Sequence, residues 1–375
     1  MEWTAFLLCA AALLIHMLSA VLALYRTRRT TSIVLTDEQL PPVTIVRPVC
    51  GLDPYDEATL RSTFALAHPE FEILFCSARE RDAAVPLVRR LIAEHPHINA
   101  RLLIGDDKST PNPKLNNVIK GWGAACHSWI VIADSNVLMP RDYVGQLFAA
   151  LRSDTGLVCS PPVGSRPDGF WAEVECAFLN TYQARWQLSA DTIGFGFAQG
   201  KSMLWRRNVL DAADGIRALG IEIAEDAAAT KVVRSKGLRV RLVDRPFEQP
   251  LGTRTRQQIL DRQVRWARLR RATFPLCYTP ELFTGSLVPI GAAVFAAPIA
   301  DLDGVSAGAI VAALWFGTEA LLARASGWHV SWISPAAWFV RDVMLPVIWL
   351  KGWIGDGFNW RGNDMTVAEA EQGRA

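Results

Sequence analysis

The sequence lacks the residue patterns typical of disulfide-rich, zinc-binding and dinucleotide-binding proteins. Its 375 residues contain seven scattered cysteines with no C-x-x-C pair and six histidines without ligand spacing. An odd, dispersed cysteine set indicates neither a disulfide framework nor a zinc site, and it favours a reducing cytosol. No G-x-G-x-x-G run or P-loop occurs, so a dinucleotide or ATP site is not supported.

Apolar residues, by contrast, are abundant. Half of the chain is hydrophobic, and the mean hydropathy of +0.15 is high for a soluble protein, so part of the chain is expected to lie in lipid. The net charge of +2 is unremarkable, but seven arginines fall between Arg254 and Arg271. Positive charge concentrated there suits anionic headgroups or a diphosphate. No nucleic acid partner is predicted.

The N-terminal segment 3–25 is nearly all apolar, with His16 as its only strongly polar residue. A helix of this length can cross a hydrocarbon core of about 30 Å. A cleaved signal peptide is the alternative, but its basic n-region is missing and Arg26, Arg28 and Arg29 follow the apolar run instead. The positive-inside rule then places the N-terminus outside and the following residues in the cytosol.

Apolar stretches also close the chain. Segments 282–300 and 305–323 predict a membrane hairpin. A third stretch, 328–349, is interrupted by Arg341 and Asp342. Placing a charged pair in the middle of a membrane span costs free energy. This stretch is predicted to be a span, a re-entrant piece or an interfacial helix. Seven tryptophans between 315 and 360 fit an aromatic belt at the headgroup level.

Residues 43–250 alternate short apolar runs with longer mixed ones. The order strand, helix, strand predicts an α/β fold with a mostly parallel sheet flanked by helices. The expected strands are 43–49, 72–78, 100–105, 129–134 and 156–162, and the expected helices are 56–67, 82–94, 114–125 and 141–152. Ligands of such sheets bind at the carboxyl ends of the strands, where Asp134 stands.

Three polar features carry possible chemistry. Asp134 supplies a hard carboxylate oxygen of the kind that binds a divalent metal, although a strand-end aspartate can also cap a turn. Asp226 is expected at a helix start, where the macrodipole favours an anion, and it can cap the helix there. Arg262 and Arg265 lie three residues apart on one helical face and can grip a diphosphate with forked hydrogen bonds.

Five ordered motifs resemble those of the ceramide glucosyltransferases, glycosyltransferase family 21, almost from end to end. They are Arg47-Pro-Val-Cys-Gly-Leu-Asp53-Pro, Asn112-Pro-Lys114-Leu-Asn116-Asn117, Ile132-Ala-Asp134-Ser, Ile223-Ala-Glu225-Asp226 and Arg262-Gln-Val-Arg265-Trp266. The resemblance implies a GT-A type fold with N- and C-terminal transmembrane helices. It also implies transfer of glucose or a close relative from a UDP-sugar to a lipid hydroxyl such as that of ceramide, with inversion.

The resemblance also implies roles for individual residues. Asp82 matches the family's first aspartate and would contact the uracil or ribose, while Lys114 and Asn116 would shape the nucleotide-sugar pocket. Asp134 would bind the sugar nucleotide through Mg²⁺ or Mn²⁺. Asp226 would be the general base.

At the Arg/Trp-rich run, the resemblance implies that Arg262 and Arg265 meet the leaving diphosphate and that Trp266 walls the acceptor site. The remaining arginines of the run, 254, 256, 268, 270 and 271, are predicted to contact membrane lipids. The glycine-bearing turn 194–202 resembles the family's turn that precedes the base. Animal relatives carry a histidine where this chain has Gln183.

The predicted organisation has five parts. These are an anchor (1–28), a cytosolic catalytic domain (40–253), an interfacial segment (254–280), transmembrane or re-entrant helices (281–353) and a tail (354–375). The alternatives to ceramide as acceptor are a hopanoid polyol or another membrane lipid. A non-catalytic membrane scaffold is the alternative from another class. The Ala- and Arg-rich composition hints at a bacterial source, whose inner membrane would then hold the protein.

Overall fold

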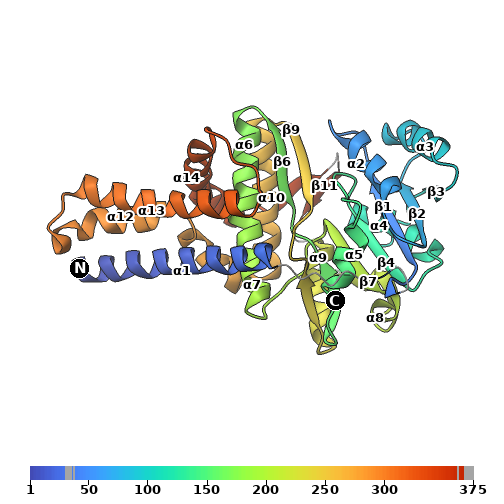
Figure 1. Cartoon of the computed structure of the whole chain (residues 1–375), viewed down its shortest axis with the longest axis horizontal. Helices are drawn as coiled ribbons and strands as arrows, with labels where there is room; N and C mark the ends of the chain where they lie inside the picture. The colour runs from blue at the N-terminus through green and yellow to red at the C-terminus, as the bar shows by residue number, and fades with distance from the viewer. Residues whose placement is uncertain (30–35, 37–38, 361–362, 367–375) are drawn as a thin grey trace. The chain divides into compact units, whose positions relative to one another are not determined.

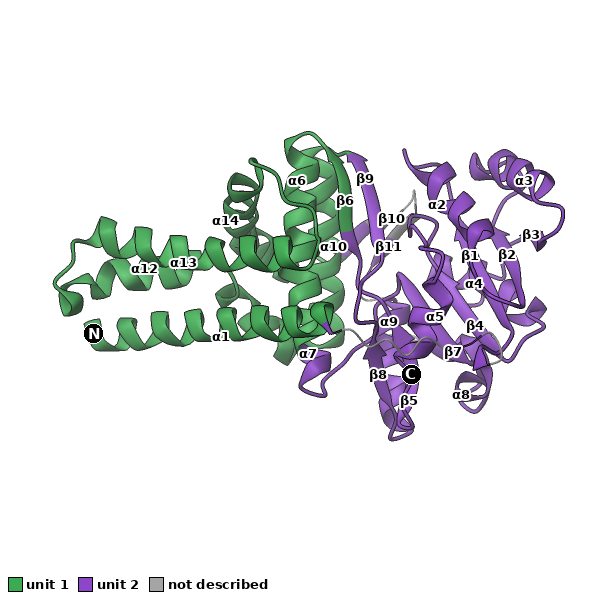
Figure 2. Ribbon diagram, viewed as in Figure 1, with its two compact units in different colours: residues 1–28, 164–189, 253–356 green, residues 29–163, 190–252, 357–375 purple. Residues whose placement is uncertain are grey.

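The computed structural model describes residues 1–29, 36, 39–360 and 363–366. The chain forms two compact units that do not follow chain order (Figure 2). Unit 1 contains residues 1–28, 164–189 and 253–356, and unit 2 contains residues 29–163, 190–252 and 357–375. Each unit therefore combines segments that are distant in the sequence.

Unit 2 is built on a mixed sheet whose strands, in spatial order, are β3-β2-β1-β4-β7-β5-β8 over the described residues. Strands β1 to β4 pair in parallel, whereas β7 runs antiparallel to both β4 and β5. Strand β1 is buried at every position, as expected for a strand covered on both faces. The bounds are β1 (Val43–Val49), β2 (Phe71–Ser77), β3 (Asn99–Ile104), β4 (Trp129–Ala133), β5 (Thr155–Cys159), β7 (Ser202–Arg206) and β8 (Arg239–Leu242).

Helices of unit 2 pack on this sheet through two apolar clusters. One cluster joins β1, β4 and β7 to α5, and the other joins β1 and β2 to α2 and α3. Helix α4 contacts β1 and β2 (Figure 1). The bounds are α2 (Asp56–Ser62), η2 (Thr63–Ala65), α3 (Ala84–Glu94), α4 (Pro113–Ala124), α5 (Tyr143–Ala149), α8 (Arg207–Asp211), η4 (Gly215–Ile221) and α9 (Glu225–Ser235). Three further strands lie wholly or mainly in this unit, namely β9 (Glu248–Thr253), β10 (Gly357–Trp360) and β11 (Asn363–Thr366).

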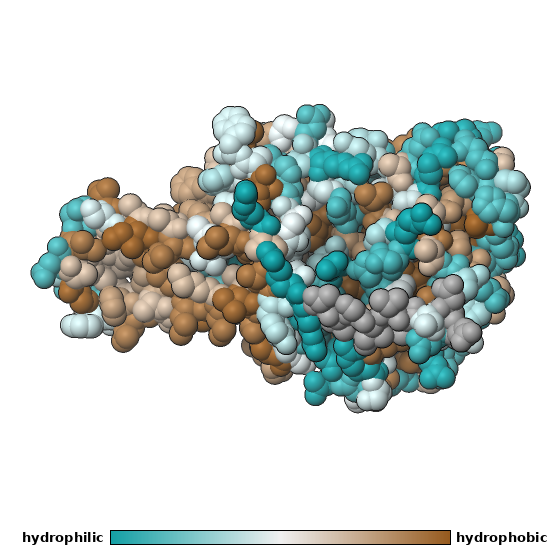
Figure 3. Space-filling view, viewed as in Figure 1, coloured by the Kyte–Doolittle hydropathy of each residue, from teal (hydrophilic) through white to brown (hydrophobic). Residues whose placement is uncertain are grey.

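Unit 1 contains three apolar helices that lie side by side, α1 (Glu2–Arg28), α12 (Leu287–Ala296) and α13 (Gly304–Ala325). Their surface is largely hydrophobic (Figure 3). Among the described residues, α1 and α13 are long and apolar enough to cross a membrane. The segments Pro275–Phe283 and Leu287–Ala300, bent by 48°, would add a third span if they cross as one.

Helix α10 and the helices that pack against it make up much of the rest of unit 1. Helices α6 and α7 flank the π-helical segment η3, and π-helical turns are frequent at functional sites. Helix α10 packs against α14 and α6, and it begins with a reciprocal capping box between Thr255 and Gln258. The bounds are β6 (Val163–Asp168), α6 (Phe170–Ala177), η3 (Phe178–Ala184), α7 (Arg185–Thr192), α10 (Arg256–Thr273), α11 (Pro275–Tyr278), η5 (Thr279–Phe283), η6 (Ala297–Ala300) and α14 (Ser334–Trp353).

The charged pair that interrupts the last apolar stretch lies inside α14 and is buried. The Arg341 guanidinium contacts Glu319 of α13 at 2.9 Å and the neighbouring Asp342 at 2.7 Å. Arg341 also donates to Thr181 Oγ1 at 2.9 Å, and Asp342 accepts the backbone N–H of Ser286 at 2.9 Å. The charges of this stretch are therefore paired within unit 1.

The predicted fold class is confirmed. The sheet is mostly parallel and flanked by helices, and apolar helices occur near the N-terminus and in the C-terminal part. The five strands expected between residues 43 and 162 all occur, the first with the expected ends and the others with shifts of up to three residues. The antiparallel strand β7 was not predicted.

Candidate active site

Asp134 directly follows β4, and its position is set by the antiparallel pairing with β7. The register pairs Ala133 with Ser202, so Asp134 and Lys201 are the next residues along the two strands. The backbone N–H of Asp134 donates to the Lys201 carbonyl at 3.0 Å. The two side chains also meet, because Lys201 Nζ lies 2.8 Å from Asp134 Oδ2.

Lys114 approaches the same carboxylate from the first turn of α4. The helix begins there because Asn112 caps it by accepting the Leu115 N–H at 3.0 Å, and Pro113 follows. Lys114 Nζ contacts Asp134 Oδ1 at 2.6 Å, Glu225 Oε1 at 2.7 Å and the Gly200 carbonyl at 2.8 Å. All three of its donors thus have acceptors.

The electrostatics of this cluster keep Lys114 charged and Asp134 ionised. Burial by itself would lower the pKa of Lys114, but Asp134 and Glu225 raise it above its ordinary value. Burial would likewise raise the pKa of Asp134, but Lys114 and Lys201 hold it well below its usual range. The cluster therefore presents fixed charges at neutral pH.

Glu225 and Asp226 form the first turn of α9. The Asn112 side chain donates to Glu225 Oε2 and to the Ile223 carbonyl, both at 2.8 Å, which ties this helix start to that of α4. The Asp226 carboxylate accepts the Ala227 N–H at 2.8 Å.

Asp226 differs from Asp134 in its protonation behaviour. Burial and the neighbouring Glu225 raise the pKa of Asp226 to about 6, while Lys114 and the backbone amides of Ala227 and Gly200 act in the opposite direction. A carboxylate with a pKa near neutral pH has the property expected of a general base.

Gly200 brings the turn before β7 into contact with this cluster. A Cβ at this position would lie 2.9 Å from Glu225 Oε1 and 3.4 Å from Lys114 Nζ. The same turn is held to α9 because the Ala198 N–H donates to Thr230 Oγ1 at 2.8 Å. A side chain at this position would displace the Glu225 carboxylate, so glycine lets the backbone approach the charged cluster closely.

A buried arginine fixes the turn that carries Asp134. The Arg47 guanidinium, on β1, donates to the carbonyls of Asp134, Ser135 and Val137 at 2.9, 2.8 and 3.1 Å. Its other terminal nitrogen, Nη1, donates to the Thr59 carbonyl and to Thr63 Oγ1. Arg47 is thus a positioning residue, which explains in physical terms why an arginine opens the first motif.

Asp82 and Asn116, the other predicted nucleotide-sugar residues of unit 2, have backbone partners. Asp82 accepts the Gly51 N–H at 2.9 and 3.1 Å and the Ala84 N–H at 2.9 Å, which joins the loop after β1 to the start of α3. The Asn116 side-chain oxygen accepts the backbone N–H and the hydroxyl of Thr110 at 2.9 and 2.8 Å, and its amide nitrogen donates to the Thr110 carbonyl at 2.8 Å. Both side chains shape loops at the carboxyl edge of the sheet, and their contact with a nucleotide stays a prediction.

Arg262, Arg265 and Trp266 belong to unit 1, on helix α10. Arg262 forms an ion pair with Glu175 of α6, and its guanidinium carbon lies 5.7 Å from the Trp266 ring centroid. Glu175 is buried and also pairs with Arg254 at 3.0 Å. One carboxylate therefore orients Arg262 within this unit.

Several of the arginines predicted to meet lipid also have partners within the protein. Arg254 pairs with Glu175, Arg270 with Glu281 at 2.7 and 2.8 Å, and Arg268 donates to the Ile354 carbonyl at 2.8 Å. Carboxylates of the chain thus neutralise Arg254 and Arg270, whereas Arg268 contacts a carbonyl.

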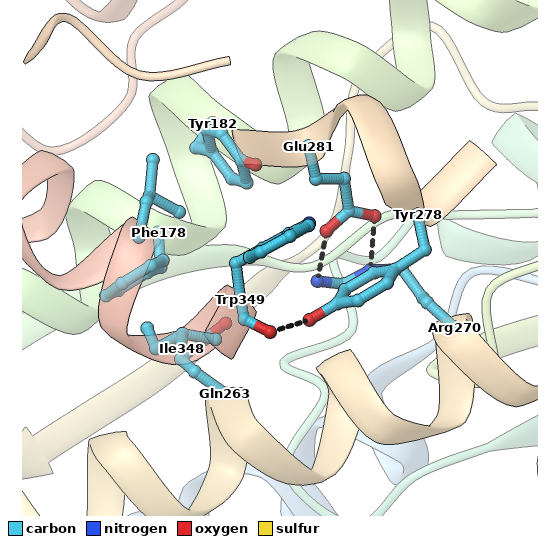
Figure 4. Close-up of a pocket in the computed structure, with 9 residues that line it drawn as sticks. Phe178, Tyr182, Gln263, Arg270, Tyr278, Glu281, Ile348 and Trp349 are labelled. Carbon is cyan, nitrogen blue, oxygen red and sulfur yellow. Dashed lines mark hydrogen bonds and ion pairs between the residues drawn. The ribbon is translucent and has the colours of Figure 1, made fainter. Parts of the chain in front are cut away.

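Unit 1 also contains a small aromatic-lined pocket between η3, α10 and α14 (Figure 4). The Arg270–Glu281 pair borders it, and the Tyr278 hydroxyl donates to the Trp349 carbonyl at 2.8 Å. Gln263 of the Arg/Trp run lines it, and its side-chain oxygen accepts from Gln183 at 3.2 Å. The lining residues are Phe178, Tyr182, Gln263, Arg270, Tyr278, Glu281, Leu345, Ile348 and Trp349.

Sequence reasoning predicted Lys114 and Asp134 but missed how closely Lys201 and Glu225 surround them. The signal for Glu225 was its place beside Asp226, and the signal for Lys201 was its place at the end of the glycine-bearing turn. Glu175 had no sequence signal. Its role depends on the packing of α6 against α10, which a linear motif does not show.

The residues around Asp134 fit a divalent cation. Asp134 Oδ2 and Asn136 Oδ1 both point at one cation, the Lys201 ammonium, at 2.8 and 3.3 Å. Carboxylate and amide oxygens are the hard ligands that Mg²⁺ and Mn²⁺ prefer. The Lys201 ammonium stands in for a positive charge at the point where these two oxygens converge.

These observations define a class of protein. An α/β unit with a carboxylate and lysine cluster at its strand ends shares one chain with helices that can cross a membrane. The model of the family described as glycosyl transferase family 21 matches residues 6–372, and the chain belongs to this family.

Curated relatives are named for one activity. Ceramide glucosyltransferase 1 of Caenorhabditis elegans is 30% identical over 264 residues, which cover 70% of this chain and 56% of that relative. Ceramide glucosyltransferase 3 of the same organism is 26% identical over 364 residues, which cover 95% of this chain and 78% of that relative. The match therefore spans little more than half the length of the first of these proteins.

Among solved structures, a mannosyltransferase from Pyrobaculum calidifontis in complex with GDP-Man and Mn²⁺ is similar. It is 17% identical, with a TM-score of 0.49, and the match covers 92% of this chain and 98% of that one.

Proposed function

We propose that this protein is an inverting, UDP-sugar-dependent hexosyltransferase at a membrane. It moves glucose or a close relative to the primary hydroxyl of ceramide and forms a β-glycosylated sphingolipid. Its catalytic unit faces the cytosol. The observation that carries the proposal is Asp226, whose pKa burial and the neighbouring Glu225 raise to about 6, at a helix start that Lys114 and Asn112 hold through Glu225. The names of the curated relatives support the lipid acceptor.

The proposed reaction is a single displacement. Asp226 takes the proton of the acceptor's primary hydroxyl as that oxygen attacks the anomeric carbon of the sugar. The bond from that carbon to the diphosphate oxygen breaks, and the electron pair leaves with UDP. Attack from the opposite side of an α-linked donor produces the β-linked product.

One fixed cation of the cluster, the Lys114 ammonium, supports the departure of the diphosphate. Lys114 is held in place by three acceptors, so its positive charge needs no reorganisation during the reaction. Asp134 and Asn136 would hold Mg²⁺ or Mn²⁺, which would stabilise negative charge on the leaving group. Asp82 and Asn116 are proposed to order the loops that line the nucleotide site.

The roles proposed for the residues of α10 are based on the family motif. Arg262 and Arg265 bind the leaving diphosphate, and Trp266 walls the acceptor site. The contact between Arg262 and Glu175 supports this role only in showing that the guanidinium is oriented by a buried carboxylate.

The direct test is transfer of label from a panel of UDP-sugars to ceramide and to a hopanoid polyol. Purified protein in detergent is assayed with Mn²⁺ or Mg²⁺, and the anomeric configuration of the product is read by NMR. We expect β-glucosylceramide. Label only in the hopanoid would keep the reaction and change the acceptor, an α-linked product would contradict inversion, and no transfer to any lipid would favour a non-catalytic scaffold.

The pH dependence of kcat/KM is expected to show an acidic limb near pH 6. Asp226 must be ionised to accept a proton, and its pKa is raised to about 6. Activity should therefore fall tenfold per pH unit below that value and stay level just above it. Initial rates between pH 3.5 and 8 at low donor concentration measure this, and a limb near pH 4 would contradict the raised pKa.

Replacing Lys114 with methionine is expected to move that limb to higher pH. The Lys114 charge lowers the pKa of Asp226, while burial and Glu225 raise it. Loss of the ammonium therefore leaves Asp226 protonated at a pH where the wild type is already ionised. Lys236→Met is the matched control, because Lys236 is half-buried in unit 2 and its ammonium donates to the Ala212 carbonyl rather than to a carboxylate. An unshifted profile in Lys114→Met would contradict the coupling.

A further inference from the structure

We propose that Lys201 is a displaceable counter-cation that makes binding of the divalent metal depend on binding of the donor's diphosphate. The inference rests on the metal and diphosphate assigned to this site under the proposed function. It adds that Lys201 occupies the cation position in the free enzyme and leaves it when both ligands bind.

The geometry places Lys201 at the convergence of two oxygen ligands. Its ammonium lies 2.8 Å from Asp134 Oδ2 and 3.3 Å from Asn136 Oδ1. Both acceptors lie on the turn after β4, which Arg47 fixes through three carbonyls. The oxygens are therefore held in place whichever cation sits between them.

The two lysines of the cluster differ in how firmly they are held. Lys114 has an acceptor for each of its three N–H donors. The Lys201 ammonium has two acceptors among the described residues, and one of these bonds, to Asn136, is long at 3.3 Å. The backbone of Lys201 is anchored by the Asp134 N–H, but its side chain is a flexible four-carbon stem. Lys201 is thus the lysine that can move at lower cost.

Charge explains why the two ligands depend on each other. A divalent cation that enters alone must displace Lys201 and stay close to the Lys114 ammonium, so like charges oppose it. When a diphosphate is present, the released Lys201 ammonium gains phosphate oxygens as partners. Linkage requires the effect to be mutual, so metal and diphosphate tighten each other's binding by the same factor.

The experiment is a titration of the full chain in detergent with Mn²⁺, followed by the EPR signal of free Mn²⁺, with and without UDP. We expect weak Mn²⁺ binding to the wild type alone and binding about tenfold tighter or more with UDP. Lys201→Met is expected to bind Mn²⁺ without UDP about tenfold tighter than the wild type, and UDP should then add little. Lys201→Arg keeps the cation and should behave as the wild type does.

Controls separate this site from other Mn²⁺ sites and from misfolding. Asp134→Asn should lose the UDP-dependent Mn²⁺ binding, and Lys236→Met should leave it unchanged. Lys201→Gln provides a second neutral variant, and circular dichroism confirms that each variant is folded.

Several results would overturn the proposal. One is Mn²⁺ affinity without UDP that is the same or weaker in both neutral Lys201 variants than in the wild type, and another is Mn²⁺ binding to the wild type that ignores UDP. Failure of lipid glycosylation is a separate readout. Coupled Mn²⁺ and UDP binding without transfer would sustain the role of Lys201 and count against the proposed reaction.

Discussion

Asp226→Asn is expected to lower kcat for sugar transfer by about 10²–10⁴-fold, the usual contribution of a general base. Asparagine has nearly the same shape as aspartate but cannot accept the proton of the acceptor hydroxyl. The side-chain oxygen can still accept the Ala227 N–H that Asp226 accepts at 2.8 Å. The protein should therefore stay folded and still bind UDP-sugar.

Steady-state kinetics and a donor-binding titration distinguish this outcome from a general loss of structure. We expect kcat to fall while donor affinity changes by less than about threefold, because the base acts in the transition state. Asp211→Asn is the matched control, since Asp211 is an exposed residue of the same unit whose ion pair with Arg207 spans 3.8 Å. A kcat for Asp226→Asn within tenfold of the wild type would exclude Asp226 as the base.

Arg341→Met is expected to destabilise unit 1 by about 3–5 kcal/mol, because it leaves buried carboxylates without their cation. Arg341 is 1% exposed and contacts Glu319 at 2.9 and 3.0 Å and Asp342 at 2.7 Å. It also donates to Thr181 Oγ1. Loss of one guanidinium thus removes the partner of two carboxylates at once.

Thermal unfolding in detergent, read by circular dichroism, measures this effect. Arg324→Met is the matched control, because Arg324 is exposed in the last turn of α13. The triple variant Arg341→Met, Glu319→Gln, Asp342→Asn should recover part of the lost stability, since it also removes the unpaired charges. An unchanged midpoint in Arg341→Met would show that the buried network contributes nothing.

Local sequence patterns predicted the first five strands and the apolar helices, and they pointed to Asp134 and Asp226 as candidate site residues. The apolar run of α1 and the strands β1 to β5 follow from hydrophobic length and alternation, which depend only on neighbouring residues. Asp134 could be predicted because it follows an apolar strand, and Asp226 because it begins a helix. The cap formed by Asn112 and Pro113 is likewise local.

Contacts between distant segments could not be predicted in this way. Lys201 meets Asp134 only because β7 inserts antiparallel beside β4 and aligns Ser202 with Ala133. Nothing in residues 194–206 alone specifies that neighbour, because strand pairing depends on the whole sheet. The partner of Arg262 was equally hidden, since Glu175 lies 87 residues earlier in the chain.

The third apolar stretch shows the same division. Because this stretch contains Arg341 and Asp342, its sequence was compatible with a membrane span, a re-entrant piece or an interfacial helix. In the tertiary structure, Glu319 of α13 and Thr181 of η3 contact Arg341, and these contacts offset the desolvation cost of burying the charged pair.

By itself, the sequence determined the family, the α/β and apolar helical segments, and the identity of the principal charged residues. Only the tertiary structure decided that segment 164–189 joins unit 1, that Lys114 and Lys201 share the Asp134 carboxylate, and that the pKa of Asp226 rises. The physical reason is that hydrophobic patterning and capping act over a few residues. Ion pairing and desolvation depend on which distant side chains the fold brings within a few ångströms.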